Sequence, residues 1–66
     1  MFTAKIIRKF GTQTDAAAVA GVGQSVVSRW IKADQIPVKR QRILLKAAKE
    51  RGIDLKAADF FDDDLN

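Results

Sequence analysis

The chain has 66 residues and a net charge of +4, and it contains neither cysteine nor histidine; this length fits a single domain. Without cysteine it has no disulfides or thiolate metal sites, and without histidine it lacks the usual nucleophile and general-base arrangements, so we expect no enzyme and no metal, cofactor or small-molecule ligand. No apolar run approaches the roughly 20 residues of a membrane span, and the N-terminus has no signal-peptide core, which predicts a cytoplasmic protein without a membrane partner.

Two short helices are predicted before residue 21. In the first, over residues 1–10, apolar side chains recur at helical spacing and form one stripe: Phe2, Ile6, Ile7 and Phe10. Gly11 ends this helix, because glycine adopts a left-handed conformation at a helix C-terminus without strain. Thr12 begins the second helix, with Asp15 three residues later in a variant of the capping box. The alanine-rich run that follows favours helix up to Gly21.

A third helix is predicted to start near Gly23 or Gln24 and to run to about Ala33. Its apolar side chains fall on one face, which we expect to be buried: Val26, Val27, Trp30 and Ile31. At this spacing, Trp30 is interpreted as a core residue rather than as a platform for a base.

The fourth predicted helix is the longest, over residues 38–51. Pro37 suits its first position, because the missing N–H of proline costs no hydrogen bond there. Its inner face is predicted to hold Ile43, Leu44, Ala47 and Ala48. Asp54 is placed to cap a last short helical turn over residues 55–61. Since no alternating β-branched run and no hairpin dipeptide is present, the chain is expected to be all-α, with four helices and this C-terminal turn.

The second and third helices, with the turn between them, form one unit over residues 12–33. A helix, a turn of three or four residues containing glycine and a second helix predict a helix-turn-helix motif. Ala17 falls where the two helices cross most closely, so a larger side chain there would push them apart. The expected core of the motif is Ala17, Gly21, Val22, Val27 and Trp30.

The opposite face of the third helix is polar. Four residues at i, i+1, i+4 and i+5 share it: Gln24, Ser25, Ser28 and Arg29. Gln can bond both N6 and N7 of adenine, Arg can bond both O6 and N7 of guanine, and Ser can bond a base or a phosphate. We therefore expect these four side chains to contact base edges in the major groove of DNA.

Several cations are placed to contact phosphates. Lys39 and Arg40 open the fourth helix, where positive charge opposes the helix dipole, and a phosphate ligand would offset that cost. Lys32, at the end of the polar face of the third helix, is assigned the same role. Lys46, Lys49 and Arg51 are equally consistent with a solvated face.

The charge is divided unevenly along the chain. Residues 1–53 hold 11 lysines and arginines against three acids, a net +8, whereas residues 54–66 hold one lysine against five aspartates, a net −4. A basic body of this density predicts a polyanionic partner, of which nucleic acid is the commonest. A solvated basic surface, or a helical module that binds an acidic protein, would also account for the charge. RNA is less well supported, because exposed aromatic stacking platforms are missing.

Short motifs spread over roughly residues 2–61 resemble the Cro repressors of lambdoid bacteriophages and the related YdaS-like bacterial regulators. The motifs are Phe10-Gly11-Thr12-Gln13, Gly21-Val22-Gly23-Gln24-Ser25, Val27-Ser28-Arg29-Trp30 and Ile36-Pro37. The resemblance implies a lambda-repressor-like domain that represses transcription from a short, roughly palindromic operator, which it binds as a homodimer. It also implies that the four polar residues of the third helix meet bases, and that Gln13 and Thr14 meet phosphates.

The chain departs from this family pattern in two places. Gly23 stands where many relatives have Ser, Thr or Asn as the cap of the recognition helix, so no side-chain cap is expected there. Some Cro proteins replace the C-terminal helices with a β-hairpin that carries the dimer interface, whereas residues 38–51 here keep helical spacing throughout.

The C-terminus is predicted to differ in character from the rest. Residues 1–61 are assigned to the DNA-binding domain and residues 62–66 to an acidic, flexible tail. Because two adjacent aromatic rings on one short turn cannot both point inward, one of Phe60 and Phe61 is expected to form a dimer contact or an exposed patch. The run Asp62–Asp64 is either a solubilising tail or a screen that limits non-specific binding to DNA.

Overall fold

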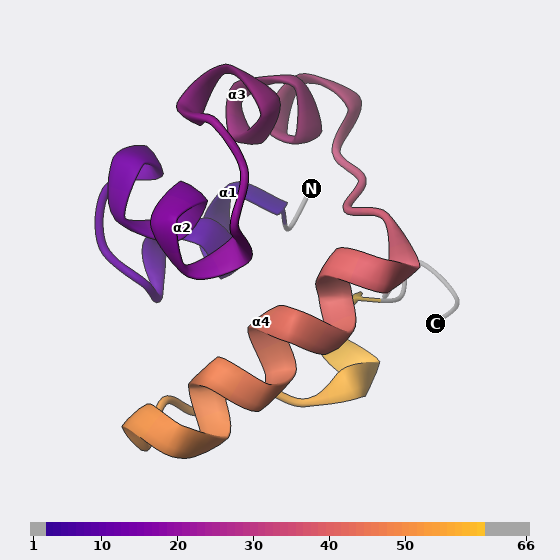
Figure 1. Cartoon of the computed structure of the whole chain (residues 1–66). Helices are drawn as coiled ribbons and strands as arrows, with labels where there is room; N and C mark the ends of the chain where they lie inside the picture. The colour runs from indigo at the N-terminus through magenta and orange to yellow at the C-terminus, as the bar shows by residue number, and fades with distance from the viewer. Residues whose placement is uncertain (1–2, 61–66) are drawn as a thin grey trace.

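The computed structural model describes residues 3–60 and is helical, with no strand within that range, which confirms the predicted all-α class. Its elements are α1 (Thr3–Arg8), α2 (Gln13–Ala20), α3 (Gln24–Ala33), α4 (Val38–Arg51) and the 3-10 helix η1 (Ala57–Phe60) (Figure 1). None of the helices in the described range has the length and apolar content needed to cross a membrane.

The junction between α1 and α2 depends on a glycine. Helix α1 ends at Arg8, and a turn leads to Gly11, whose φ is +113°. A Cβ built on Gly11 would lie 2.5 Å from Asp15 Oδ2, so both the backbone conformation and the space exclude a side chain. Phe2, predicted to belong to the stripe of the first helix, lies outside the described residues.

The start of α2 is the predicted capping box. Thr12 Oγ1 accepts a hydrogen bond from the Asp15 N–H at 3.1 Å, and Asp15 Oδ2 accepts one from the Thr12 N–H at 2.9 Å. The pKa of Asp15 lies below its ordinary value of 3.8, first because the Thr12 backbone N–H and then because the Thr12 hydroxyl bonds the carboxylate. The two reciprocal hydrogen bonds satisfy the N–H groups of Thr12 and Asp15 at the N-terminal end of the helix.

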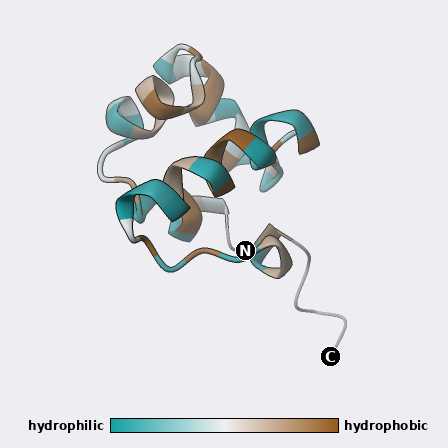
Figure 2. Ribbon diagram, turned by 60° about the horizontal axis from the view of Figure 1, so that its bottom comes forward, coloured by the Kyte–Doolittle hydropathy of each residue, from teal (hydrophilic) through white to brown (hydrophobic). Residues whose placement is uncertain are grey.

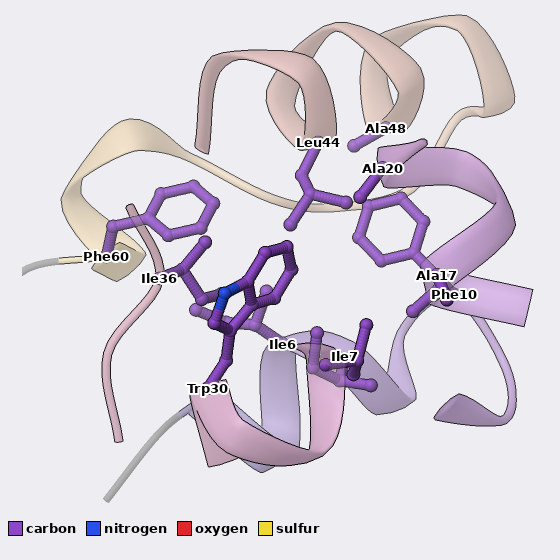
Figure 3. Close-up of a cluster of buried hydrophobic side chains, with 12 residues drawn as sticks. Ile6, Ile7, Phe10, Ala17, Ala20, Trp30, Ile36, Leu44, Ala48 and Phe60 are labelled. Atoms are coloured by element: carbon purple, nitrogen blue, oxygen red, sulfur yellow. The ribbon is translucent and has the colours of Figure 1, made fainter. Parts of the chain in front are cut away.

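One hydrophobic core joins all five elements. Its buried apolar side chains are Ile6, Ile7, Phe10, Ala16, Ala17, Ala20, Val27, Trp30, Ile36, Leu44, Ala48 and Phe60. Figure 3 shows Leu44 and Ala48 facing Ala20, and along α4 hydrophobic turns alternate with hydrophilic ones (Figure 2). The side chains that α2 contributes to this core are all alanines: Ala16, Ala17 and Ala20.

The inner face of α4 is centred on Leu44 and Ala48, which are buried as expected. Ile43 and Ala47 are only half-buried, and of the half-buried residues Leu45 and Ala47 pack against the core. The position of α2 selects this pair, because Leu44 and Ala48 are the residues that face Ala20 (Figure 3). Spacing alone could not choose between the 43/47 and 44/48 pairs.

Helix α4 contacts both ends of α2. Near its start, Arg40 Nη1 donates a hydrogen bond to the Ala20 carbonyl oxygen at 3.3 Å, and near its end the charge of Arg51 acts on Asp15 at the start of α2. The helix spans Val38–Arg51, as predicted, but Pro37 is its N-cap rather than its first residue. Pro37 precedes it, and its carbonyl oxygen accepts hydrogen bonds from the Arg40 and Gln41 N–H groups, both at 2.9 Å.

The connection after α3 also anchors the N-terminus. Asp34 adopts a left-handed conformation, with φ 55° and ψ 44°, which Asp tolerates better than most residues. Its Oδ1 accepts a hydrogen bond from the Thr3 N–H at 3.0 Å. The same aspartate therefore ends α3 and bonds the first turn of α1.

The C-terminal turn is held by Asp59. Its Oδ2 accepts a hydrogen bond from the Lys56 N–H at 2.9 Å. The prediction that Asp54 caps this turn is therefore wrong, because the carboxylate that bonds the backbone here belongs to Asp59. The Asp54 carbonyl oxygen instead accepts a hydrogen bond from Lys9 Nζ at 2.9 Å, which ties the segment to the end of α1. Phe60 is 7% exposed and completes the core.

Candidate nucleic-acid interface

Helix α3 is held against α2 by the residues predicted as the core of the motif. Val27 is 0% exposed, Ala17 and Trp30 are also buried, and Val22 is half-buried against the same cluster. Gly21 is different, because it lies in the exposed turn rather than in the core. Its φ is +75°, and a Cβ there would meet no atom within 4 Å, so the backbone conformation alone requires glycine at this position.

The opposite face of α3 is open to solvent. Gln24, Ser25 and Arg29 are exposed, and Ser28 is half-buried. Lys32, one turn further on, is exposed too. The structure thus brings the four residues predicted to contact bases onto one continuous surface of about one and a half turns, while Val27 and Trp30 fix the helix from behind.

Gln24 is positioned by a residue of α2. Its Nε2 donates a hydrogen bond to Gln13 Oε1 at 2.8 Å, and both residues are the first of their helices. A glutamine amide has two N–H donors and a carbonyl acceptor. With one N–H bonded to Gln13, Gln24 keeps one N–H and its carbonyl oxygen, which is the pair of groups that adenine N7 and N6 require.

The start of α2 borders a groove that the sequence did not reveal. It has a volume of about 430 Å³, and its lining residues are Ala4, Ile7, Arg8, Gly11, Thr12, Gln13 and Ile31. Thr14, which follows Gln13 in the chain, is exposed. Arg8 thus joins Gln13 and Thr14 as a candidate phosphate contact. The outward direction of Arg8 was predictable from helical spacing, but its position beside α2 depends on how the two helices pack.

The two residues predicted to contact phosphates at the start of α4 differ in their surroundings. Lys39 is exposed, whereas Arg40 is half-buried and already bonds Ala20 through Nη1. That bond satisfies a carbonyl at the C-terminal end of α2, so Arg40 has a role within the fold. Its phosphate contact stays a prediction and would use its remaining N–H groups.

The candidate dimer contacts are not both available. Phe60 is buried in its own chain, so little of its ring is left for a partner. Phe61 lies outside the described residues.

Comparisons with protein families, with curated proteins and with solved structures find no match to this chain.

Proposed function

We propose that this chain is a sequence-specific regulator of transcription that binds double-stranded DNA, a Cro-like repressor with a lambda-repressor-like helix-turn-helix domain. In this proposal α3 enters the major groove of a palindromic operator, and a homodimer occupies the two half-sites. Repression follows from occupation of a promoter, with no chemistry performed. The observation that carries the proposal is the exposed polar face of α3, anchored from behind by Val27 and Trp30.

Base recognition is assigned to the residues of that face. Arg29 is exposed and can bond guanine O6 and N7 at once, while Gln24, oriented by Gln13, can bond adenine. Each good bidentate contact is worth about 1–3 kcal/mol of discrimination. Ser25 and Ser28 are shorter and contribute either base or phosphate contacts.

Most of the affinity is assigned to phosphate contacts at the edges of the same surface. The residues concerned are Arg8, Gln13, Thr14, Lys32, Lys39 and Arg40. Cations that neutralise phosphates release counterions, so log K should fall linearly with log salt, with a slope of about −0.9 for each phosphate contacted. A helical module for an acidic protein would also be salt-sensitive, but it would give no reason for Gln, Ser and Arg to share one face.

Selection of bound sequences from a library of random duplexes tests the proposal. We expect enrichment of one site with two half-sites related by a two-fold axis. A matched variant with Gln24→Ala and Arg29→Ala changes only exposed side chains, so it should fold normally and bind duplexes without enriching any sequence. Absence of enrichment with the unaltered chain would contradict a sequence-specific regulator.

A further inference from the structure

The outward face of α4 carries a row of cations. Four exposed residues, spaced at three, four and three positions, lie on one side of the helix, opposite buried Leu44 and Ala48. We call them the cationic row: Lys39, Arg42, Lys46 and Lys49. With a rise of 1.5 Å per residue, the part from Lys39 to Lys46 covers about 10 Å. Glu50 is the single acid of α4, so the row is nearly uniform in charge.

The described part of the chain ends close to the start of α4. The ring of Phe60 is buried and lies beside Ile36 (Figure 3). Gln41 Nε2 donates a hydrogen bond to the Ile36 carbonyl oxygen at 2.7 Å, which holds Ile36 against the first turn of α4. Since Lys39 is only three residues after Ile36, Phe60, the last described residue, lies near the end of α4 at which Lys39 is found.

Three aspartates follow Phe60 in the sequence, at positions 62–64. Asp62 and Asp64, which lie outside the described residues, are two and four positions after Phe60. At no more than about 3.6 Å per residue, they can extend about 7 and 14 Å from it. Because they are tethered, their effective concentration at the row is on the order of millimolar.

We propose that the run Asp62–Asp64 binds the cationic row at Lys39 and Arg42 and competes there with the phosphates of DNA. Exposed ion pairs are individually weak and are screened by salt, so a polyanion can displace the run. The competition lowers the affinity for a random duplex most, because such a duplex is bound mainly through phosphates. An operator is also bound through base contacts, which the run leaves untouched. The competition rests on the proposed function; the contact with α4 does not.

Backbone amide spectra of the free protein test the contact. The variant with Asp62→Asn and Asp63→Asn is compared with a control that removes two exposed charges elsewhere, Glu50→Gln with Asp54→Asn. We expect the first pair to shift the amides of residues 39–42 at low salt, and the shift to disappear near 0.5 M salt, where the screening length is only a few ångströms. Changes confined to residues 61–66 would overturn the proposal.

Binding to a random duplex at about 50 mM salt tests the competition. The Asp62→Asn and Asp63→Asn variant should bind about three- to tenfold more tightly than the Glu50→Gln and Asp54→Asn control, since two weak ion pairs no longer compete. Equal affinities of the two variants would overturn the competition. If neither variant binds DNA while the amides of residues 39–42 still shift, the proposed function and the competition fail, and the contact stands.

Discussion

Two glycines that flank Val22 should respond in opposite ways to the same substitution. Gly23 precedes α3 with φ −77° and ψ 158°, no side chain caps the helix there, and a Cβ would lie 3.9 Å from Ser25 Oγ, an ordinary contact. Gly21 has φ +75°, which L-residues other than Asn and Asp seldom adopt. Gly23→Ser should therefore stabilise the protein, and Gly21→Ser should destabilise it.

The sizes of the two effects follow from the backbone. Gly23→Ser reduces the entropy of the unfolded chain and adds an N-cap hydroxyl, worth together about 0.5–1 kcal/mol. Gly21→Ser forces a side chain into the left-handed region at a cost of about 1–2 kcal/mol. A chain of 66 residues unfolds with an entropy of roughly 140 cal/mol/K, so Tm should rise by about 4–7 °C for the first variant and fall by about 7–14 °C for the second.

Thermal unfolding followed by circular dichroism measures both changes under the same conditions. The total free energy of unfolding for this length is about 3–10 kcal/mol, so both variants should remain folded at low temperature. Shifts of Tm in the same direction would refute the reasoning, because the two substitutions differ only in backbone conformation and capping. A lower Tm for Gly23→Ser alone would show that the cap position is not open to a side chain.

Three further changes test single contacts by chemical or thermal unfolding. Thr3 is 0% exposed and its Oγ1 has no hydrogen-bond partner in the described range, so Thr3→Val should be neutral or stabilising by up to about 1 kcal/mol; a loss of more than that would reveal a bond to the hydroxyl. Asp34→Ala should be more destabilising than Asp34→Asn, because Asn retains both the left-handed conformation and an acceptor for the Thr3 N–H; equal losses would argue against this bond. The lowered pKa of Asp15 means that its contribution to the free energy of unfolding is complete above pH 3.8 and is lost as the pH falls through its folded pKa, so Asp15→Asn should flatten this part of the pH profile, and an unchanged profile would contradict the assignment.

Local chemistry explains which parts of the fold were predictable from sequence. The capping box needs only Thr12 and Asp15, three residues apart, and the left-handed end of α2 at Gly21 needs only the conformational freedom of glycine. The helices themselves follow from spacing and composition. Each of these features depends on neighbours within one turn, so the pattern was sufficient.

Features that depend on the packing of one helix against another were not predictable in the same way. The choice of Leu44 over Ile43 for the core depends on where α2 lies, and the hydrogen bond from Arg40 to Ala20 joins residues 20 apart. The Gln13–Gln24 bond likewise joins two side chains that the sequence assigned separately to phosphate and base contacts. For the candidate site, the sequence therefore predicted the exposed face of α3 but neither the positioning of Gln24 nor the place of Arg8.

The central claim is that the exposed face of α3 distinguishes bases while cations outside it bind phosphates. The most direct measurement is the base preference at every position of the selected operator, determined for Arg29→Ala and for Lys39→Ala. Both residues are exposed, so neither substitution should disturb the core. We predict that Arg29→Ala loses about 1–3 kcal/mol of preference at one position in each half-site, and that Lys39→Ala weakens binding to all sequences about equally. A uniform loss for Arg29→Ala, with a lost preference at one position for Lys39→Ala, would contradict the account.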